Sequence, residues 1–285
     1  MELQFQEERR IVMNKILLKI NKEDELKYPV SGYILGINKF SYLFEKTYSI
    51  SEIKDIKNNN LDKEIFVSFN KIIFNDELDD YKSMLEEVDE IGVNGIIVGD
   101  IAALTYNLKT NIILDQLHLN NSYYTLNHYE NNDVKGFVLT NDITKEEINE
   151  IRENTKSLLF KQVFGYPHLS TSKRLLISNY LKHFDIESTE YVYQISEKNS
   201  DNYYKIIEDE FGTHILGSNP LNLLGTNLDV DYYIIDSYLL SDIKDVVTIF
   251  INNDIDKKDL LDNTYSANDG FINRETIYKV KNDEK

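Results

Sequence analysis

The sequence contains no cysteine among its 285 residues. The chain therefore forms no disulfide and offers no thiol nucleophile, no thiolate zinc ligand and no cysteine-ligated iron–sulfur cluster. Long apolar runs are also missing, since the first apolar stretch, IVMNKILLKI (11–20), is interrupted by Asn14, Lys15 and Lys19. No run reaches the ~18 residues of a membrane span, and none has the pattern of a signal peptide. We expect a cytoplasmic protein that does not interact with membranes.

Basic residues are scarce as well. The chain has 31 Lys and Arg against 49 Asp and Glu, which gives a net charge of −18. An acidic surface of this kind repels phosphate backbones, so we expect nucleic acid to be bound only with a basic partner or a local basic patch. The hydrophobic share of 41% still allows a substantial core, and the length suits one barrel-like domain over residues 1–285.

Common catalytic and cofactor motifs do not occur. The sequence lacks the GxxxxGK[ST] phosphate loop, the GxGxxG dinucleotide motif and the GxSxG nucleophile elbow. It has histidines at five positions, none in an HExxH or HxH arrangement: His118, His128, His168, His183 and His214. We therefore predict neither a metal nor a cofactor and assign no catalytic residue. Carboxylate pairs are plentiful, but in so acidic a chain they are typical of solvated surfaces.

Apolar runs alternate with segments of helical spacing. The clearest helices are 76–92, which ends at Gly92, and 144–155, where Thr144 and Glu147 form a capping box; 219–228 is expected as a short helix. The strand-like runs are KILLKI (15–20), GYILGI (32–37), EIFVSFN (64–70), GIIVG (95–99), NIILDQL (111–117), GFVLT (136–140), SLLFKQVF (157–164) and DYYIIDSYL (231–239). This rhythm predicts an α/β fold, a regular or distorted (β/α)8 barrel, with a doubly wound sheet as the alternative. Alternating patterns at 190–195 and 203–217 predict an inserted β-hairpin, within 187–218, before the last barrel strand.

Polar residues follow many of these strands. In a barrel the carboxyl ends of the strands share one rim, where binding sites lie. The same residue types also cap helices, which is the alternative interpretation of each position. The rim residues of the predicted barrel are Asn38, Asn70, Asp100, Asp115, Gln116, Asn141, Asp142, His168 and Asp236.

The segment GYPHLSTSKRLLISNYL (165–181) leads from a predicted strand into a predicted helix. Gly165 and Pro167 indicate a rigid turn, and the Ser/Thr cluster at 170–172 could cap a helix over 173–184. A helix start beside Lys173 and Arg174 favours an anion. The alternative is a capped helix whose basic pair lies in solvent.

This segment resembles the signature region of peptidase family U-32, a collagenase-like family of uncertain catalytic type. Segments 32–40, 66–104, 208–224 and 269–280 also resemble that family, so the likeness spans most of residues 30–280. It is nearest to the shorter Firmicutes-type members, which occur as paired paralogues and are linked to tRNA hydroxylation. The resemblance implies a barrel-like fold and a part in prephenate-dependent 5-hydroxylation of the tRNA wobble uridine. It also implies a paralogous U-32 protein as partner, through which tRNA would be bound.

Several family positions differ here. The signature cysteine position falls near His168 and Leu169, so the four-cysteine iron–sulfur cluster of some relatives has no ligands. Asn141 and Asp142 replace an Arg-Glu pair, and Ile234 replaces a lysine. A peptidase and a non-catalytic anion-binding or scaffold paralogue therefore stay open as alternatives. The predicted substrate-binding residues are Lys173, Arg174, Asn179, Tyr180, His168, Asn70, Asp100, Asp115 and Asp236.

Overall fold

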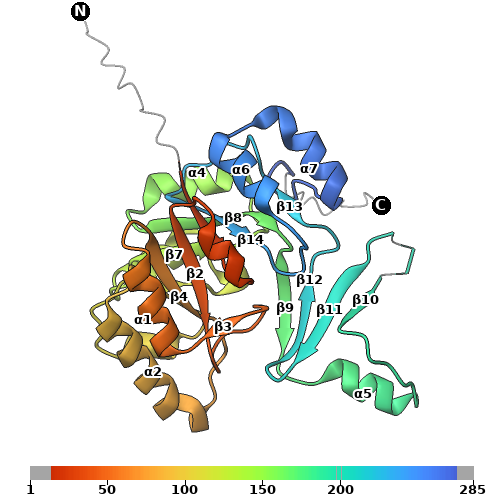
Figure 1. Ribbon diagram of the computed structural model, residues 1–285, viewed down its shortest axis with the longest axis horizontal. Helices are drawn as coiled ribbons and strands as arrows, with labels where there is room; N and C mark the ends of the chain where they lie inside the picture. Colours follow the sequence, from red (N-terminus) through yellow and green to blue (C-terminus); the bar gives the residue numbers. More distant parts are fainter. Residues whose placement is uncertain (1–13, 197, 200, 275–285) are drawn as a thin grey trace, which may run out of the picture.

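The computed structural model describes residues 14–196, 198–199 and 201–274. Its centre is a closed barrel of eight parallel strands (Figure 1). Strand β1 pairs with β14 on one side and with β2 on the other, which closes the ring. The barrel prediction is confirmed, and the doubly wound alternative is wrong because an open sheet would leave β1 or β2 at an edge. The strands are β1 (Lys15–Lys19), β2 (Gly32–Ile37), β4 (Glu64–Phe69), β5 (Gly95–Val98), β6 (Ile112–Leu114), β7 (Gly136–Leu139), β8 (Leu158–Gly165) and β14 (Tyr232–Asp236).

Helices surround this barrel. They are α1 (Ile50–Asn59), α2 (Leu78–Ile91), α3 (Tyr123–Glu130), α4 (Lys145–Asn154), α6 (Lys244–Asn252) and α7 (Lys258–Tyr265). The predicted capping box of Thr144 and Glu147 starts α4, and Gly92 ends α2 with a left-handed φ of 69°. The barrel is distorted, because only the short 3-10 helices η1 (Glu23–Lys27) and η3 (Ile101–Thr105) follow β1 and β5.

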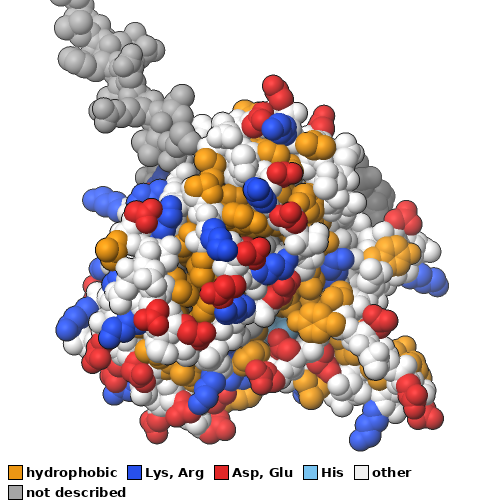
Figure 2. Space-filling model, viewed as in Figure 1, with side chains coloured by type: hydrophobic (Ala, Val, Ile, Leu, Met, Phe, Trp, Pro, Cys, Tyr) orange, Lys and Arg blue, Asp and Glu red, His pale blue; other side chains and the backbone are white. Residues whose placement is uncertain are grey.

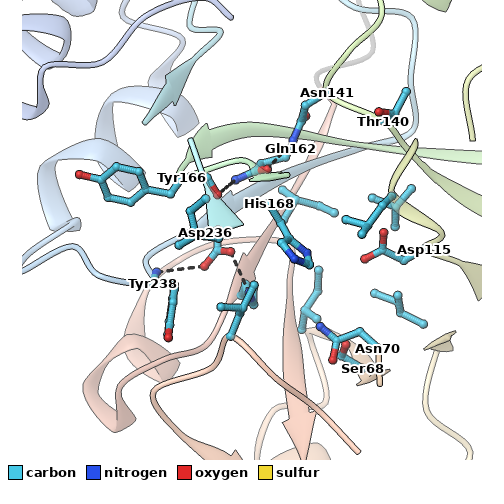
Figure 3. Close-up of a pocket in the computed structure, with 18 of the residues that line it drawn as sticks. Ser68, Asn70, Asp115, Thr140, Asn141, Gln162, Tyr166, His168, Asp236 and Tyr238 are labelled. Atoms are coloured by element: carbon cyan, nitrogen blue, oxygen red, sulfur yellow. Dashed lines mark hydrogen bonds and ion pairs between the residues drawn. The ribbon is translucent and has the colours of Figure 1, made fainter. Parts of the chain in front are cut away.

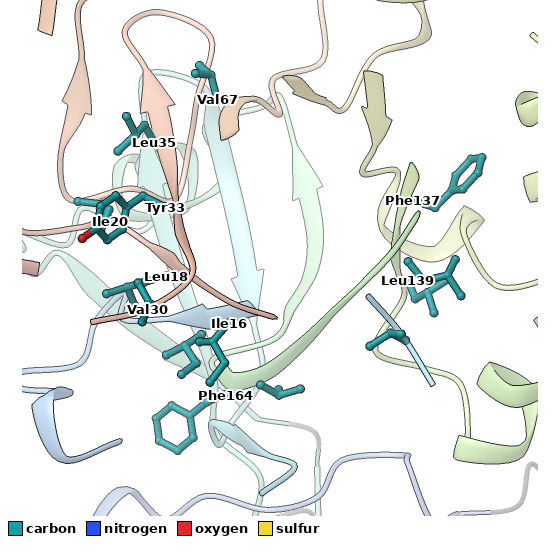
Figure 4. Close-up of a cluster of buried hydrophobic side chains, with 14 of the residues drawn as sticks. Ile16, Leu18, Ile20, Val30, Tyr33, Leu35, Val67, Phe137, Leu139 and Phe164 are labelled. Carbon is teal, nitrogen blue, oxygen red and sulfur yellow. The ribbon is translucent and has the colours of Figure 1, made fainter. Parts of the chain in front are cut away.

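The strands bury side chains on both faces. Alternate residues point into the barrel, where an inner cluster includes Leu17, Phe66 and Phe160. The residues between them point outward and pack beneath the helices, as Leu18 and Leu35 do (Figure 4). Two buried faces explain why these strands are nearly continuous apolar runs in the sequence.

An antiparallel sheet is inserted between β8 and β14. Its order is β10 (Val192–Ile195), β11 (Tyr204–Asp209), β12 (Gly212–Leu216) and β9 (His168–Ser172). Helix α5 (Leu176–His183) lies between β9 and β10, at the end of this sheet away from the barrel (Figure 1). The predicted insertion before the last barrel strand is thus present, and β9 joins it from outside the range 187–218.

Two local predictions are wrong. The Ser/Thr cluster 170–172 does not cap a helix, because it belongs to β9 and pairs with β12. The helix expected over 219–228 is absent from these described residues, since Leu221–Asn222 form strand β13 and pair antiparallel with the end of β8. In both places a pairing with a distant segment satisfies the backbone groups that a helix would have satisfied locally.

Gly165 makes the turn from the barrel into the inserted sheet. Its φ is +112°, a conformation that only glycine adopts readily, and a Cβ atom here would lie 2.3 Å from the carbonyl oxygen of Asp236. The close approach of β14 therefore requires glycine at the end of β8.

Candidate functional site

A pocket of about 120 Å³ lies at the carboxyl ends of the barrel strands (Figure 3). The inserted sheet closes one side of it, because His168 of β9 and Leu216 of β12 are among the lining residues. The pocket is therefore built jointly by the barrel and the insertion. Its charged and polar lining residues are Lys19, Ser68, Asn70, Asp115, His118, Thr140, Asn141, Asp142, Gln162, Tyr166, His168, Asp236 and Tyr238.

Lys19 and Asp236 form an ion pair in this pocket. They are adjacent in the β1–β14 register, and their Nζ and Oδ2 atoms are 2.8 Å apart. Only 14% of each side chain is exposed, and Lys19 Nζ also lies 4.4 Å from the ring centroid of Phe44. Asp236 further accepts hydrogen bonds from the Asn21 side chain and the Tyr238 backbone N–H. These contacts hold both charges in fixed positions.

Asp115 follows β6 and has the most perturbed carboxyl group of the pocket. Burial raises its pKa to about 6, against the opposing effects of the Lys19 charge and the Leu117 backbone N–H. A carboxyl group with this pKa can both donate and accept a proton near neutral pH. The pocket therefore has one side chain suited to general acid or base chemistry.

His118 connects three segments at the pocket rim. Its Nδ1 atom is 2.5 Å from Asp142 Oδ2, and its Nε2 atom is 2.7 Å from the carbonyl oxygen of Leu169. Both partners are acceptors, so only the doubly protonated ring satisfies both contacts. The Leu169 carbonyl and Asp142 raise the pKa of His118 although burial opposes them. The charged ring thus ties the barrel rim to the start of the inserted sheet.

We expect this contact to make stability depend on pH. Because the folded-state pKa of His118 is raised, its contribution is complete below the unfolded pKa of about 6.5 and is lost as pH rises through the folded value. His118→Gln should lower the free energy of unfolding by about 0.5 kcal/mol at acidic pH, a small effect because water and salt screen these half-exposed groups. Urea denaturation at about pH 6 and pH 9 measures it. His183→Gln on exposed α5 is the control, and an equal loss for His118→Gln at both pH values would contradict the prediction.

Four of the predicted substrate-binding residues come together in the pocket, namely Asn70, Asp115, His168 and Asp236. The Asn70 amide exchanges two hydrogen bonds with the backbone of Tyr42, at 3.0 and 3.2 Å, so it also anchors the loop after β2. Asp100 does not line the pocket. Its carboxylate accepts from the backbone N–H groups of Ala102 and Ile73, which makes it the cap of η3.

The other four predicted residues, Lys173, Arg174, Asn179 and Tyr180, lie at the outer end of the insertion and do not line the pocket. Lys173 donates to the carbonyl oxygen of Ile72 and sits above the Phe74 ring.

The prediction that the start of this helix faces an external anion is wrong. The carboxylate of Glu208 accepts hydrogen bonds from the backbone N–H groups of Ile177 and Ser178, in the first turn of α5. An acidic side chain of the chain itself therefore occupies the position expected for an anion.

Sequence reasoning did not propose Lys19, His118 or Gln162 as site residues. Lys19 and Gln162 each lie two positions after an inward-facing residue, Leu17 and Phe160, so the alternation of a barrel strand could have placed them inside. Of the remaining rim residues, Asn141 and Asp142 line the pocket, while Asn38 and Gln116 do not.

Two kinds of feature are absent from the described ranges, a cluster of metal ligands and a membrane-spanning helix. Within them, no group of three or more His, Asp or Glu side chains is arranged to hold a metal ion. None of the helices built from these residues is long and apolar enough to cross a membrane. The full sequence also contains no cysteine that could act as a metal ligand.

A closed parallel barrel with a polar pocket at the carboxyl ends of its strands defines a TIM-barrel protein. The family model of Peptidase family U32 matches residues 30–230, so the chain belongs to peptidase family U32. A solved structure of the U32 peptidase Mk0906 aligns with 79% of this chain and 92% of its own, with a TM-score of 0.50 and 13% identity, and shares the fold.

A curated relative gives a more specific likeness. The chain is 31% identical over 172 residues to the tRNA hydroxylation protein P2 of Bacillus subtilis (strain 168). This match covers 56% of the chain and 55% of the relative, so it spans about half the length of each protein.

Proposed function

We propose that this chain acts in the 5-hydroxylation of the tRNA wobble uridine, together with a paralogous U32 protein. The observation that carries the proposal is the 31% identity to the tRNA hydroxylation protein P2. The polar pocket at the barrel rim supports it, because a carboxyl group with the raised pKa of Asp115 can exchange a proton near neutral pH. The small volume of the pocket suits one small group better than an extended peptide.

Charge supports the need for a partner. With a net charge of −18 the chain attracts tRNA poorly. On the face shown in Figure 2, Lys and Arg side chains are interspersed with Asp and Glu and do not gather into a basic patch. Helix α5 and its C-cap leave Leu176, Tyr180 and Phe184 exposed at a spacing of four residues, which gives a partner an apolar face to contact.

The test is nucleoside mass spectrometry of bulk tRNA from strains that lack this protein, its paralogue or both. We expect 5-hydroxyuridine-derived wobble nucleosides to be lost in the double deletion and restored by plasmids carrying both genes. Tagged protein should recover the paralogue, and the pair should bind tRNA in a salt-dependent manner. An unchanged nucleoside profile in the double deletion would refute the proposal and favour a peptidase or a non-catalytic paralogue.

Replacing Asp115 by Asn should separate function from stability. Because burial raises the folded-state pKa to about 6, the ionised carboxylate destabilises the fold as pH rises from the unfolded pKa through the folded one. Asp115→Asn should therefore raise the free energy of unfolding by about 2 kcal/mol at pH 8 and change it little near pH 4. The same variant should fail to restore the modified nucleosides. Asp62→Asn, an exposed change before β4 at the opposite end of the barrel, should restore them fully.

A variant that is more stable but inactive would show that Asp115 is kept for the reaction. Full complementation by Asp115→Asn would instead show that the reaction does not need this carboxyl group. The proposed function would then depend on other residues of the pocket.

A further inference from the structure

A chain of hydrogen-bonding side chains leads from the pocket into the inserted sheet. It begins at His168, whose ring lies among the lining side chains in Figure 3. His168 Nε2 is 2.8 Å from Thr171 Oγ1, and Thr171 Oγ1 is 3.0 Å from His214 Nδ1. His214 Nε2 is 3.1 Å from Asp209 Oδ1. The residues come from β9, β12 and β11, so the folded sheet itself assembles the chain.

The two ends of this chain fix the direction of its hydrogen bonds. The carboxylate of Asp209 only accepts, so His214 Nε2 carries a hydrogen. The carbonyl oxygen of Ser170 also only accepts, and it lies 3.1 Å from His168 Nε2, so this nitrogen carries a hydrogen too. The Thr171 hydroxyl satisfies both neighbours when it accepts from His168 and donates to His214.

The surrounding groups keep the His168 ring uncharged. Burial first and then His214, Lys19 and His118 lower its pKa to about 3, against the Ser170 carbonyl. Tyr42 packs edge-on against the His168 ring and stacks on His214, with ring centroids 5.5 and 4.6 Å apart.

Three of the carboxylates near this ring are already paired. Asp236 pairs with Lys19, Asp142 with His118 and Asp209 with His214, and Asp115 lines the same pocket. The remaining nitrogen, His168 Nδ1, has no hydrogen-bond partner in the part of the chain that the structure describes.

We propose that the inserted sheet fixes His168 as the Nε2–H tautomer, so that Nδ1 is a permanent, uncharged hydrogen-bond acceptor in the pocket. A ligand group bound against Nδ1 is then an O–H or N–H donor. A carbonyl or carboxylate oxygen there would set two acceptors face to face. His168 acts as a positioning residue for that donor. The inference goes beyond the tRNA role and does not depend on it, because it holds for whichever small group enters the pocket.

Long-range 1H–15N correlation NMR of the full chain labelled with [15N]histidine tests the tautomer directly. His168→Gln and His214→Gln assign the two sets of signals, and free N-acetylhistidine in the same tube reports an ordinary imidazole with a pKa of about 6.5. Both residues should show the Nε2–H pattern, and His168 should keep it at about pH 6, where the reference is mostly protonated. An Nδ1–H pattern for His168, or protonation of His168 together with the reference, would overturn the proposal.

Two substitutions of Thr171 test the link within the sheet. Thr171→Val keeps the shape of the side chain but removes the hydroxyl, and Thr171→Ser keeps the hydroxyl. In the valine variant the His168 Nε2 hydrogen retains only the longer contact to Ser170, so it should exchange with water about tenfold faster. The serine variant should exchange like the unmodified chain. Equal exchange in all three proteins would show that Thr171 does not hold the tautomer.

Discussion

Phe160→Ala is expected to lower the free energy of unfolding by about 3–5 kcal/mol, the cost of deleting a large aromatic side chain from a packed core. Phe160 is fully buried inside the barrel. Its ring stacks on Tyr232 with centroids 4.4 Å apart and meets Phe66 edge-on at 5.4 Å. A closed ring of hydrogen-bonded strands cannot collapse into the space that the missing ring leaves, so the cavity should persist.

Guanidinium denaturation followed by circular dichroism measures this loss. Phe160→Leu, which keeps more of the volume, should fall between the alanine variant and the original chain. Phe184→Ala at the C-cap of α5 is the matched control, because the same side chain is 57% exposed there and its removal should cost about 0.5 kcal/mol or less. A loss below about 1 kcal/mol for Phe160→Ala would mean that the barrel interior adjusts more freely than its packing indicates.

Lys19→Met should cost about 3 kcal/mol, because it leaves the charge of Asp236 in a mostly enclosed pocket without its ion-pair partner. The hydrogen bonds from Asn21 and Tyr238 offset part of the loss, so the value lies at the lower end for buried pairs. The double variant Lys19→Met/Asp236→Leu removes both charges, and its stability should return to within about 1 kcal/mol of the original.

The pair of Lys15 and Glu64 is the control for this cycle. Lys15 belongs to the same strand, but its side chain is 53% exposed, so Lys15→Met should cost less than about 1 kcal/mol. The cycle also needs the single variant Asp236→Leu. If the loss in the double variant equalled the sum of the losses in Lys19→Met and Asp236→Leu, the two charges would not be coupled and the explanation would fail.

Much of the barrel could be predicted because its strands bury both faces. Runs such as GIIVG and GFVLT have no polar interruption, and the helices between them carry local signals such as the Thr144–Glu147 capping box. The strand β9 could not be predicted in the same way. Its sequence, HLSTS, is polar and short, and its partner β12 lies some forty residues further along the chain. Only the long-range pairing makes it a strand.

The candidate site shows the same limit. Asp100 and Asp115 both follow apolar strands, and nothing in the residue type separates them. In the structure Asp100 accepts a hydrogen bond from a backbone N–H in the next helix, η3, whereas Asp115 lines the pocket. A related limit explains the wrong prediction of an anion site beside Lys173 and Arg174. The carboxylate that caps the helix after them, Glu208, comes from β11.

The inserted sheet meets the pocket through the beginning of β9 and the end of β12, while α5 lies further out. Sequence changes in these two parts therefore have different consequences for the pocket. Lengthening, trimming or replacing the outer segment that holds α5, between Arg174 and Glu190, would leave the lining of the pocket and the Asp209–His214 contact in place. This outer segment is therefore free to diverge with each interaction it serves. A change in His168 or Leu216 would instead alter the cavity itself. Chimeras that exchange only the outer segment between two relatives should thus inherit the pocket of one parent and the contacts of the other.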